Sequence, residues 1–295
     1  MNCFFLRHGL AGIAGVVFLI SACATKSIPS YTIHDFSDER ADGLSGLTSD
    51  ENMDLWTIQE RRQHLLYMQN TPDGLKAQSL PIIGIPQEID LEAITYLGKQ
   101  TFALGSESEA TERNDDKVYI VEMHNGEAQV TQIISIPYHH WNTQPDSNHG
   151  LEALCYAEQQ LIVGIEKVLE ENGQRYAPLL LHSLQTTQAQ PLRLKLTTAK
   201  GKISAMACRH LPQEEHIEIF AIERHFGIGR VLKFSIDKNF KMSSVEIVYD
   251  FAPEIKDLPN IEGISFGLDG ELYMISDNNF GGITGPTKVI KLTKP

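Results

Sequence analysis

The sequence predicts an all-β protein with the architecture of a β-propeller. The first observation is a repeat: five times, a short turn-and-strand signature is followed about fifteen residues later by an apolar strand that ends in an acid. The copies begin at Ser45, Glu92, Glu152, Ser204 and Glu262, and the acids that end them are Glu60, Glu107, Glu166, Glu223 and Asp277. The second observation is that the strands are short, β-rich and separated by Gly, Pro, Asn and Asp. Repeats of roughly 50 residues built from short strands are typical of propeller blades.

Each copy accommodates four strands, and the second copy shows them best. Its strands are predicted at 92–97, 101–107, 117–123 and 129–137. The third and fourth copies repeat the pattern, and the first has its outer pair at 65–69 and 75–81. Residues 56–68 are the best rival for a helix. We interpret them as two strands, because their place in the repeat matches that of residues 161–167.

The ends of the repeat array predict how the ring closes. The fifth copy has only three strands, at 262–267, 272–277 and 287–292, whereas residues 31–36 precede the first copy without a blade of their own. We expect residues 31–36 to complete the last blade, because a closed ring leaves no open sheet edge. Five blades are predicted. Six is the alternative, if a degenerate blade lies within residues 38–81.

The N-terminal segment predicts a lipoprotein leader. Arg7 supplies a positive charge, and residues 9–20 form an apolar core too short to span a bilayer as a permanent helix. The sequence Ile20-Ser21-Ala22-Cys23 resembles the bacterial lipobox, which implies cleavage before Cys23 and lipidation of its thiol. Ala24 follows, and this favours the outer membrane, facing the periplasm or the cell surface. An ordinary signal peptide with a coincidental cysteine is the alternative.

The predicted organisation is therefore simple. Residues 1–22 form the signal peptide, residues 23–30 a lipidated linker, and residues 31–295 a single propeller domain. No later segment looks transmembrane, so the lipid would be the only membrane attachment. The net charge of −13 argues against nucleic acid and anionic lipid surfaces as partners. We expect a monomer that suits cations, neutral ligands or a metal-bridged anion.

Two cysteines remain once Cys3 is assigned to the leader and Cys23 to the anchor. Cys155 and Cys208 fall in the first strands of adjacent repeats, three and four residues into their copies. An oxidising periplasm would permit a disulfide. Simple alternation along a strand, however, directs the two side chains to opposite sheet faces. Two separate buried thiols are therefore predicted.

The repeat also predicts that the acids meet at one mouth of the central channel. In a blade, the innermost strand and its neighbour form a hairpin, so the start of the first lies beside the end of the second. Glu60, Glu107, Glu166, Glu223 and Asp277 would form a ring, with Glu92, Glu152 and Glu262 just inside it. So many carboxylates raise one another's pKa unless cations neutralise them. Local candidates are Arg61, Lys167 and Arg224, each of which follows a ring acid.

Three interpretations of this ring stay open. The carboxylates could be structural, holding the blades in register through hydrogen bonds and ion pairs. They could bind a divalent cation such as calcium, which takes several carboxylate and carbonyl oxygens. They could also perform acid–base catalysis, which needs two carboxyl groups with well-separated pKa values. His225, directly after Glu223-Arg224, is a further candidate proton carrier, with an exposed histidine as the alternative.

Loops on the same face add weaker signals. His139-His140-Trp141 and His149 lie in one connection, where Trp141 could stack on a ligand or anchor the loop. Residues 106–116 are interpreted as a mobile surface loop, and Asp277-Asn278-Asn279 as an Asx-rich turn or part of the site. No Gly-x-Ser-x-Gly elbow, phosphate loop or Cys-x-x-Cys pair is present. These absences argue against a serine hydrolase of the usual kind.

Several short motifs resemble the phytase-like family described as having esterase-like activity of phytase. They are Asp90-Leu91-Glu92-Ala93-Ile94, His149-Gly150-Leu151-Glu152-Ala153-Leu154, Phe220-Ala221-Ile222-Glu223-Arg224, Ile261-Glu262-Gly263-Ile264 and Ser276-Asp277-Asn278. The resemblance spans roughly residues 44–292. It implies a secreted or periplasmic propeller, calcium-dependent in some members, that acts on phosphate or other esters. Only Asp277 among the strand-end acids is an aspartate, which argues against phytate itself as substrate.

The leading hypothesis is thus an envelope lipoprotein that acts as a metal-assisted ester or phosphoester hydrolase. In this hypothesis Glu60, Glu92, Glu152, Glu262 and Asp277 hold calcium, while Glu107, Glu166, Glu223, Arg61, Lys167 and Arg224 serve catalysis and anion binding. The partner would be a small-molecule ester or phosphoester. The alternative is a non-catalytic propeller scaffold that binds a ligand or an envelope protein.

Overall fold

The protein is described by a computed structural model that covers residues 29–71, 74–107, 113–146, 149–211, 213–255, 257–278 and 285–293. The predicted signal peptide, Cys23 and most of the linker lie outside these residues. So do residues 108–112 of the predicted mobile loop, and Asn279 with the glycines that follow it. Among the described residues, no helix has the length and apolar character that a bilayer-spanning helix needs.

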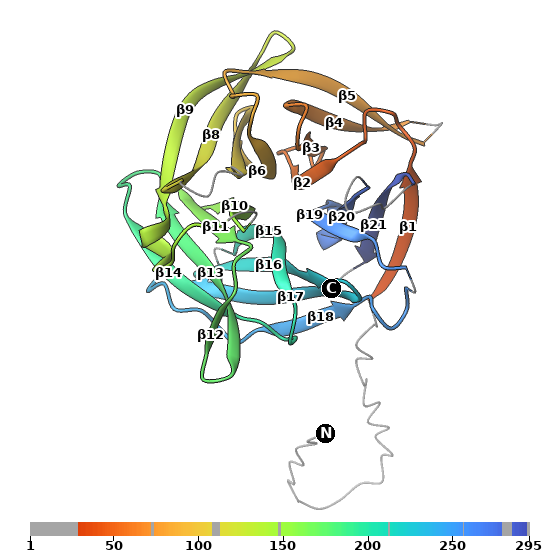
Figure 1. Ribbon diagram of the computed structural model, residues 1–295. Coiled ribbons are helices and arrows are strands. Elements are labelled where there is room, and N and C mark those ends of the chain that lie inside the picture. Colours follow the sequence, from red (N-terminus) through yellow and green to blue (C-terminus); the bar gives the residue numbers. More distant parts are fainter. Residues whose placement is uncertain are drawn as a thin grey trace, which may run out of the picture.

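The all-β prediction is confirmed, and the sheets stand like blades around a central axis (Figure 1). In chain order the strands are β1 (Ser30–Phe36), β2 (Leu44–Ser49), β3 (Leu55–Gln59), β4 (His64–Thr71), β5 (Gly74–Ile83), β6 (Asp90–Gly98), β7 (Thr101–Glu107), β8 (Asp115–His124), β9 (Glu127–Pro137), β10 (Leu151–Ala157), β11 (Gln160–Ile165), β12 (Leu169–Glu171), β13 (Gln174–Ser183), β14 (Ala189–Lys195), β15 (Lys202–Leu211), β16 (His216–His225), β17 (Ile228–Asp237), β18 (Glu246–Asp250), β19 (Asn260–Phe266), β20 (Leu272–Asp277) and β21 (Thr287–Thr293). Two short 3₁₀ helices, η1 (Tyr138–Trp141) and η2 (Leu268–Gly270), lie in connections.

The described strands group into antiparallel units that follow the sequence copies. These units are β2–β5, β6–β9, β10–β14, β15–β18, and β19–β21 together with β1. Residues 38–81 hold the four strands β2–β5 of one unit, and residues 56–68 form parts of β3 and β4 rather than a helix. The first two units also join at their outer strands, where Ile82 and Ile83 of β5 pair in parallel with Ala128 and Gln129 of β9.

The N-terminal strand closes the ring, as predicted. β1 pairs antiparallel with β21 along its whole length, from Ser30 opposite Thr293 to Phe36 opposite Thr287. Figure 1 shows this strand on the outside of the last blade, far in sequence from its partner. Its apolar residues pack the strand onto the protein. Phe36 is fully buried, and Tyr31 packs edge-on against Tyr249 and Phe251 of the preceding blade.

Each innermost strand has a β-bulge close to its start. The register shifts lie between Ser45 and Leu47, Leu91 and Ala93, Leu151 and Ala153, Ile203 and Ala205, and Ile261 and Gly263. A bulge adds a residue to one strand and re-aims the side chains around it. In four blades the extra residue is the one that begins the sequence copy: Glu92, Glu152, Ser204 and Glu262. In the first blade it is Gly46, one residue after Ser45.

The prediction of two separate thiols is wrong, because Cys155 and Cys208 form a disulfide with a Cα–Cα distance of 5.6 Å. The alternation of side chains along a strand describes the two faces of a single sheet only. In a propeller, one face of each blade packs against the opposite face of the next, and an apolar cluster that includes Cys155, Met206 and Ile219 fills the space between β10–β14 and β15–β18. Side chains on opposite faces of adjacent blades therefore point at each other.

Candidate functional site at the mouth of the channel

The hairpin register brings the start of each innermost strand beside the end of its neighbour. Asp90 pairs with Glu107 across β6 and β7, and Asn260 pairs with Asp277 across β19 and β20. The innermost strands β2, β6, β10, β15 and β19 contact one another in turn around the axis (Figure 1). The structure thereby gathers most of the repeat acids at one end of the channel.

Below this mouth the channel is narrow and mainly apolar. It is lined by small and aliphatic residues such as Gly46, Ala93 and Ala205, with Glu152 and Glu262 at the acid end. The opening measures about 10 Å³, which is room for about one water molecule. An organic ligand therefore does not fit at this level, whereas further along the innermost strands a pocket of about 80 Å³ is lined by residues such as Thr48, Thr95 and Ser265.

Glu107 is held in a buried polar cluster behind the mouth. Arg113 Nη2 donates to Glu107 Oε1 at 3.0 Å, and the Gly150 N–H donates to the same oxygen at 2.7 Å. Arg113 also lies 3.0 Å from Asp116, whose Oδ2 accepts from the Tyr138 hydroxyl at 2.6 Å. Burial raises the pKa of Glu107, although these donors oppose the shift. The contacts give Glu107 a structural role that links the second blade to the third.

Glu223 faces away from the other acids and is fully buried. Its two oxygens accept hydrogen bonds from the backbone N–H groups and hydroxyls of Thr197 and Thr198, at 2.9 Å for the Thr198 N–H. These threonines follow β14, so Glu223 fastens the connection between the third and fourth blades. Its neighbour Arg224, in contrast, points to the mouth.

Two ion pairs neutralise the fourth-blade side of the mouth. The Arg224 guanidinium binds Glu262, with Nε donating to Oε2 at 3.0 Å, and the Asn260 amide donates to Oε1 of Glu262 at 2.8 Å. The Lys202 ammonium contacts Glu166, and Arg224 Nη2 lies 3.8 Å from the same carboxylate. Lys202 was missed from the sequence. It lies opposite Arg224 in the β15–β16 register, two residues before the Ser204 that marks the copy.

The other buried carboxylates of the mouth, Glu60, Glu92 and Glu152, form no ion pair with the described residues, although the charge of Arg224 opposes the rise in the pKa of Glu152. Burial, and after it the charge of Asp277, raises the pKa of Glu60 to about 8. Burial and the charges of Glu60 and Glu262 raise the pKa of Glu92 well above its usual range, and burial with Glu92 and Glu262 does the same to the pKa of Glu152. Within the described residues, Glu152 accepts no hydrogen bond, and Glu92 Oε2 accepts one, from Ser45 Oγ at 3.2 Å.

The other predicted cations lie at the rim. The Arg61 side chain is 69% exposed and its Nε is 3.7 Å from Asp90. Lys167 extends to the loop and donates to the Gln144 carbonyl at 2.9 Å. Neither side chain pairs with the ring acid that precedes it. Among the described residues, Arg113, Arg224 and Lys202 are therefore cations that reach the repeat acids.

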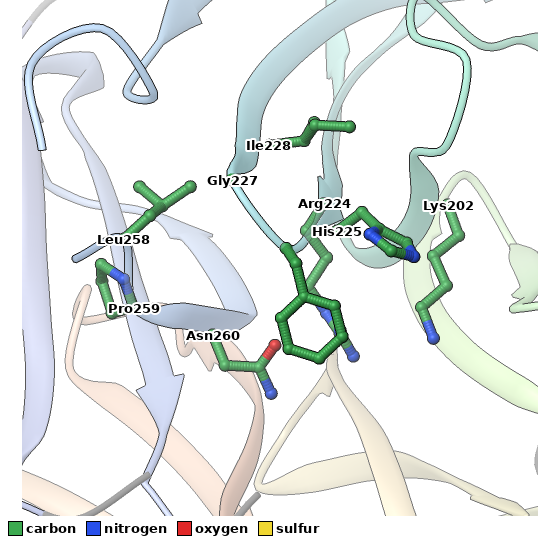
Figure 2. A pocket seen from close by; sticks show the side chains of 9 residues that line it. Lys202, Arg224, His225, Gly227, Ile228, Leu258, Pro259 and Asn260 are labelled. Carbon is green, nitrogen blue, oxygen red and sulfur yellow. The ribbon is translucent and has the colours of Figure 1, made fainter. Parts of the chain in front are cut away.

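A pocket of about 120 Å³ opens beside these ion pairs (Figure 2). Lys202, Arg224 and His225 line one side, and Leu258, Pro259 and Asn260 line the other. Phe226, in the β16–β17 turn, is 81% exposed at its edge. The pocket thus presents cationic groups opposite an apolar wall, directly next to the acids.

His225 has an unusual position in this pocket. Its Nδ1 is buried and has no hydrogen-bond partner among the described residues. Burial lowers the pKa of His225, and the positive charges of Lys202, Lys200 and Arg224 lower it further. The imidazole is therefore neutral at pH 7 and can accept a proton.

A ready-made metal site is not present in the described part of the chain. No group of three His, Cys, Asp or Glu side chains comes close enough to hold an ion there. Calcium takes six to eight oxygen ligands, and Glu107, Glu166, Glu223 and Glu262 are already bound to other groups of the protein. Glu60, Glu92 and Glu152 have suitable chemistry but not a complete set of ligands, so calcium binding stays a prediction.

The loop residues are mostly structural. Trp141 is 2% exposed within η1 and packs against Tyr138, so it anchors its loop rather than stacking on a ligand. His139 and His140 contact each other on the same helix, and His149 lies 3.6 Å from Asp146. Asn278 accepts from the Gly43 N–H at 3.1 Å and donates to the Gly285 carbonyl at 2.9 Å. Asn278 therefore behaves as a turn former, as one of the two interpretations proposed.

Comparisons with known proteins agree with this architecture. A family model described as "Phytase-like: Esterase-like activity of phytase" matches residues 39–280. Among solved structures, the PQQ-bound aldose sugar dehydrogenase from Streptomyces coelicolor superposes with a TM-score of 0.50 at 8% identity, covering 89% of this chain and 98% of that one. An exo-β-1,3-galactanase from Phanerochaete chrysosporium, with β-1,3-galactotriose, gives a TM-score of 0.54 at 8% identity, covering 90% and 64%. No curated protein sequence matches the chain. At such low identity, the structural similarities establish the fold alone.

Proposed function

Because the chain belongs to the phytase-like family, described by its esterase-like activity of phytase, we propose that it hydrolyses an anionic ester or a phosphoester at the channel mouth. The observation that carries the proposal is a pocket lined by Lys202, Arg224 and His225 at a mouth where Glu92 and Glu152 are buried and form no ion pair with the described residues. The two halves of this site correspond to the two needs of ester hydrolysis: a place for negative charge, and groups that transfer protons.

The cationic half would bind the substrate. Lys202, Arg224 and the Asn260 amide border the pocket and offer N–H donors to a phosphate or carboxylate oxygen. Burial and the nearby Arg224 lower the pKa of Lys202. A bound anion would therefore stabilise the charged form of the Lys202 ammonium group. The apolar wall of Leu258 and Pro259, with exposed Phe226 at the edge, would receive an aryl or alkyl leaving group.

The acidic half would supply protons. Burial raises the pKa of Glu92 and of Glu152, and the charge of Glu92 raises the pKa of Glu152 further. We propose that one of the two is the protonated acid. The protonated member can donate to the leaving-group oxygen while neutral His225 accepts a proton from the attacking water. When two titratable groups lie in different environments, one can be the acid and the other the base at pH 7. Here the protonated carboxyl group would be the acid and the neutral imidazole the base.

Calcium forms a separate part of the proposal. We propose that Glu60, Glu92 and Glu152 are the ligands available to it, with water and substrate oxygens completing the shell. When bound, the ion would polarise a substrate oxygen. Because calcium ligands are deprotonated, the ion would replace the protonated acid rather than act together with it. The dependence of activity on calcium and on chelator distinguishes the two.

The test is an assay of the purified protein on an aryl phosphate and an aryl carboxylate ester, with calcium and with chelator. E152Q removes one titrating carboxyl group. The Glu152 side chain accepts no hydrogen bond from the described residues. We expect kcat to fall by roughly 10²- to 10⁴-fold. The matched control E171Q changes an exposed acid in β12 that pairs with Arg193 and should leave kcat unchanged. Wild-type rates equal to those of E152Q on both substrates would reject the hydrolase.

A binding scaffold is the second candidate function, and one observation favours it. Glu107, Glu166, Glu223 and Glu262 all have structural partners within the protein, as carboxylates that keep blades in register would. This candidate expects no turnover of either substrate and a retained partner from the cell envelope. Recovery of a defined complex by crosslinking, together with unchanged capture by E152Q, would support it.

Localisation is proposed from the leader alone. We propose that Cys23 carries the lipid and that the protein faces the periplasm or the cell surface from the outer membrane. Replacing Cys23 with Ser should move the protein from the outer-membrane fraction to the soluble fraction. A C23S protein that stays with the membrane would reject lipidation as the anchor.

A further inference from the structure

We propose a second binding site, for a small organic cation, at the end of the propeller opposite the acid mouth. It is a pocket of about 200 Å³ between the first and second blades. Its lining comes from three turns and the strand starts beside them: residues 50–52 with Trp56, Tyr96 with Gln100 and Phe102, and residues 123–126.

The two sites lie at opposite ends of the same strands. Asp50 and Glu51 precede the start of β3, whereas Glu60 follows its end; Gln100 precedes β7, whereas Glu107 ends it. A strand of seven residues such as β7 spans roughly 20 Å. The acid mouth and this pocket are therefore separate, and a ligand in one does not touch the other.

Aromatic rings form the inner wall of the pocket. The Trp56 ring lies 5.2 Å from that of Phe102, and the Tyr96 ring lies 5.1 Å from Phe102, centroid to centroid. Trp56 also packs on Tyr67 at 4.8 Å. Phe102 is buried at the base, while Trp56 and Tyr96 are partly exposed. Partly exposed aromatic faces attract cations electrostatically.

The carboxylates of the pocket are placed by hydrogen bonds with these same rings. Trp56 Nε1 donates to Asp50 Oδ2 at 3.0 Å, and the Tyr96 hydroxyl contacts Glu51. The Gln100 N–H donates to the Tyr96 oxygen at 3.1 Å and fixes the ring from the far side. Rings and negative charges are thus held at one place, before any ligand arrives.

The charge of the lining selects the ligand class. Asp50 and Glu51 contribute two carboxylates, and the lining residues include no Lys or Arg. An anion would meet repulsion there, and a neutral ligand would leave the carboxylates uncompensated by charge. An alkylammonium group satisfies both features, since it is attracted to the ring faces and neutralises the acids. Asn52, Gln100 and Asn125 could then hydrogen-bond a polar tail such as a hydroxyl.

The test uses choline as probe and 3,3-dimethylbutan-1-ol as its uncharged isostere. The chain has two tryptophans, and the other, Trp141, is buried far from this pocket. In a W141F background, choline should change Trp56 fluorescence saturably, and the isostere should bind at least roughly fivefold more weakly. Calorimetry on the wild-type protein gives the same comparison if W141F does not fold.

Variants connect the binding to the pocket. E51Q removes the charge and keeps the side-chain size, so choline affinity should fall roughly fivefold or more. E88Q changes an exposed acid outside the lining and should bind choline as the wild type does. Equal affinity for choline and the isostere, or unchanged choline binding in E51Q, would overturn the proposal. Because esterase activity belongs to the other end of the molecule, E51Q should retain it, which separates this proposal from the proposed function.

Discussion

Replacing Arg224 with Met measures how much the ion pairs of the mouth contribute to stability. The Arg224 side chain is 12% exposed, binds Glu262 and approaches Glu166 at 3.8 Å. Met keeps the apolar stem and removes the charge, so two buried carboxylates lose a shared cation. Breaking a buried pair in this way costs about 3–5 kcal/mol. We therefore expect R224M to lower the free energy of unfolding by about 3 kcal/mol at pH 7.5.

The loss of unfolding free energy in R224M should be smaller at low pH, because the buried carboxylates can then be protonated. Burial raises the pKa of Glu262 in the folded protein, and Arg224 is the main group that opposes this shift. Without Arg224 the folded pKa rises further above the unfolded value of about 4.3. A group whose folded pKa is raised binds more protons when folded, so stability falls as pH rises between the two values. At pH 4.5 the difference between R224M and wild type should fall below about 1.5 kcal/mol.

Urea unfolding, followed by far-UV circular dichroism at both pH values, measures this difference. R61M is the matched control, because Arg61 is exposed and its nearest carboxylate is 3.7 Å away. It should change stability by less than about 0.5 kcal/mol at either pH. If R224M loses the same free energy at pH 7.5 and pH 4.5, or if R61M loses as much as R224M, the electrostatic account of the mouth is wrong.

Two further predictions concern stability. Burial and Asp277 raise the pKa of Glu60 to about 8, so Glu60 destabilises the folded protein as pH rises from about 4.3 to about 8. E60Q should therefore gain up to about 5 kcal/mol of stability at pH 9 and little at pH 4. A pH-independent effect in thermal melts would contradict this. Cys155 and Cys208 are 53 residues apart in sequence, so reduction of the disulfide should lower the free energy of unfolding by about 4 kcal/mol. The C155S/C208S double variant should be insensitive to reductant and as stable as the reduced wild type. An unchanged melting temperature of the wild type in reductant would refute the disulfide.

The repeat made the architecture readable from the sequence. Strand propensity, turn residues and a regular spacing of acids all indicate the same blades, and the surplus strand at residues 31–36 matches the missing one in the last copy. Local patterns suffice here, because each blade is a local meander with its own turns. The disulfide shows the limit of this reasoning. Alternation assigned the faces of Cys155 and Cys208, but only the stacking of blades shows that those faces meet.

The site was less predictable, because the same repeat position meets different neighbours in different blades. The fourth copy also ends one residue later than predicted: Asp90 pairs with Glu107, but at the same place in the fourth blade Lys202 pairs with Arg224. Glu107 receives Arg113 and the Gly150 N–H, while Glu223 receives two threonines. Those partners come from connecting segments, which do not repeat. Lys202 and Arg113 carried no motif of their own. Their importance follows from long-range contacts, and no spacing within one copy encodes these.

The pairing of β1 with β21 has a consequence for biogenesis. The hydrogen-bonded Ser30 and Thr293 are separated by 263 residues, so the first strand to be synthesised finds its partner only when nearly the whole chain has been made. Contacts of such long sequence separation form slowly. Until then β1 and the last blade each expose an edge able to pair with a foreign strand. A chain of this design therefore benefits from chaperone protection until β21 has been made, and deletion of β1 or β21 should yield a species prone to aggregation.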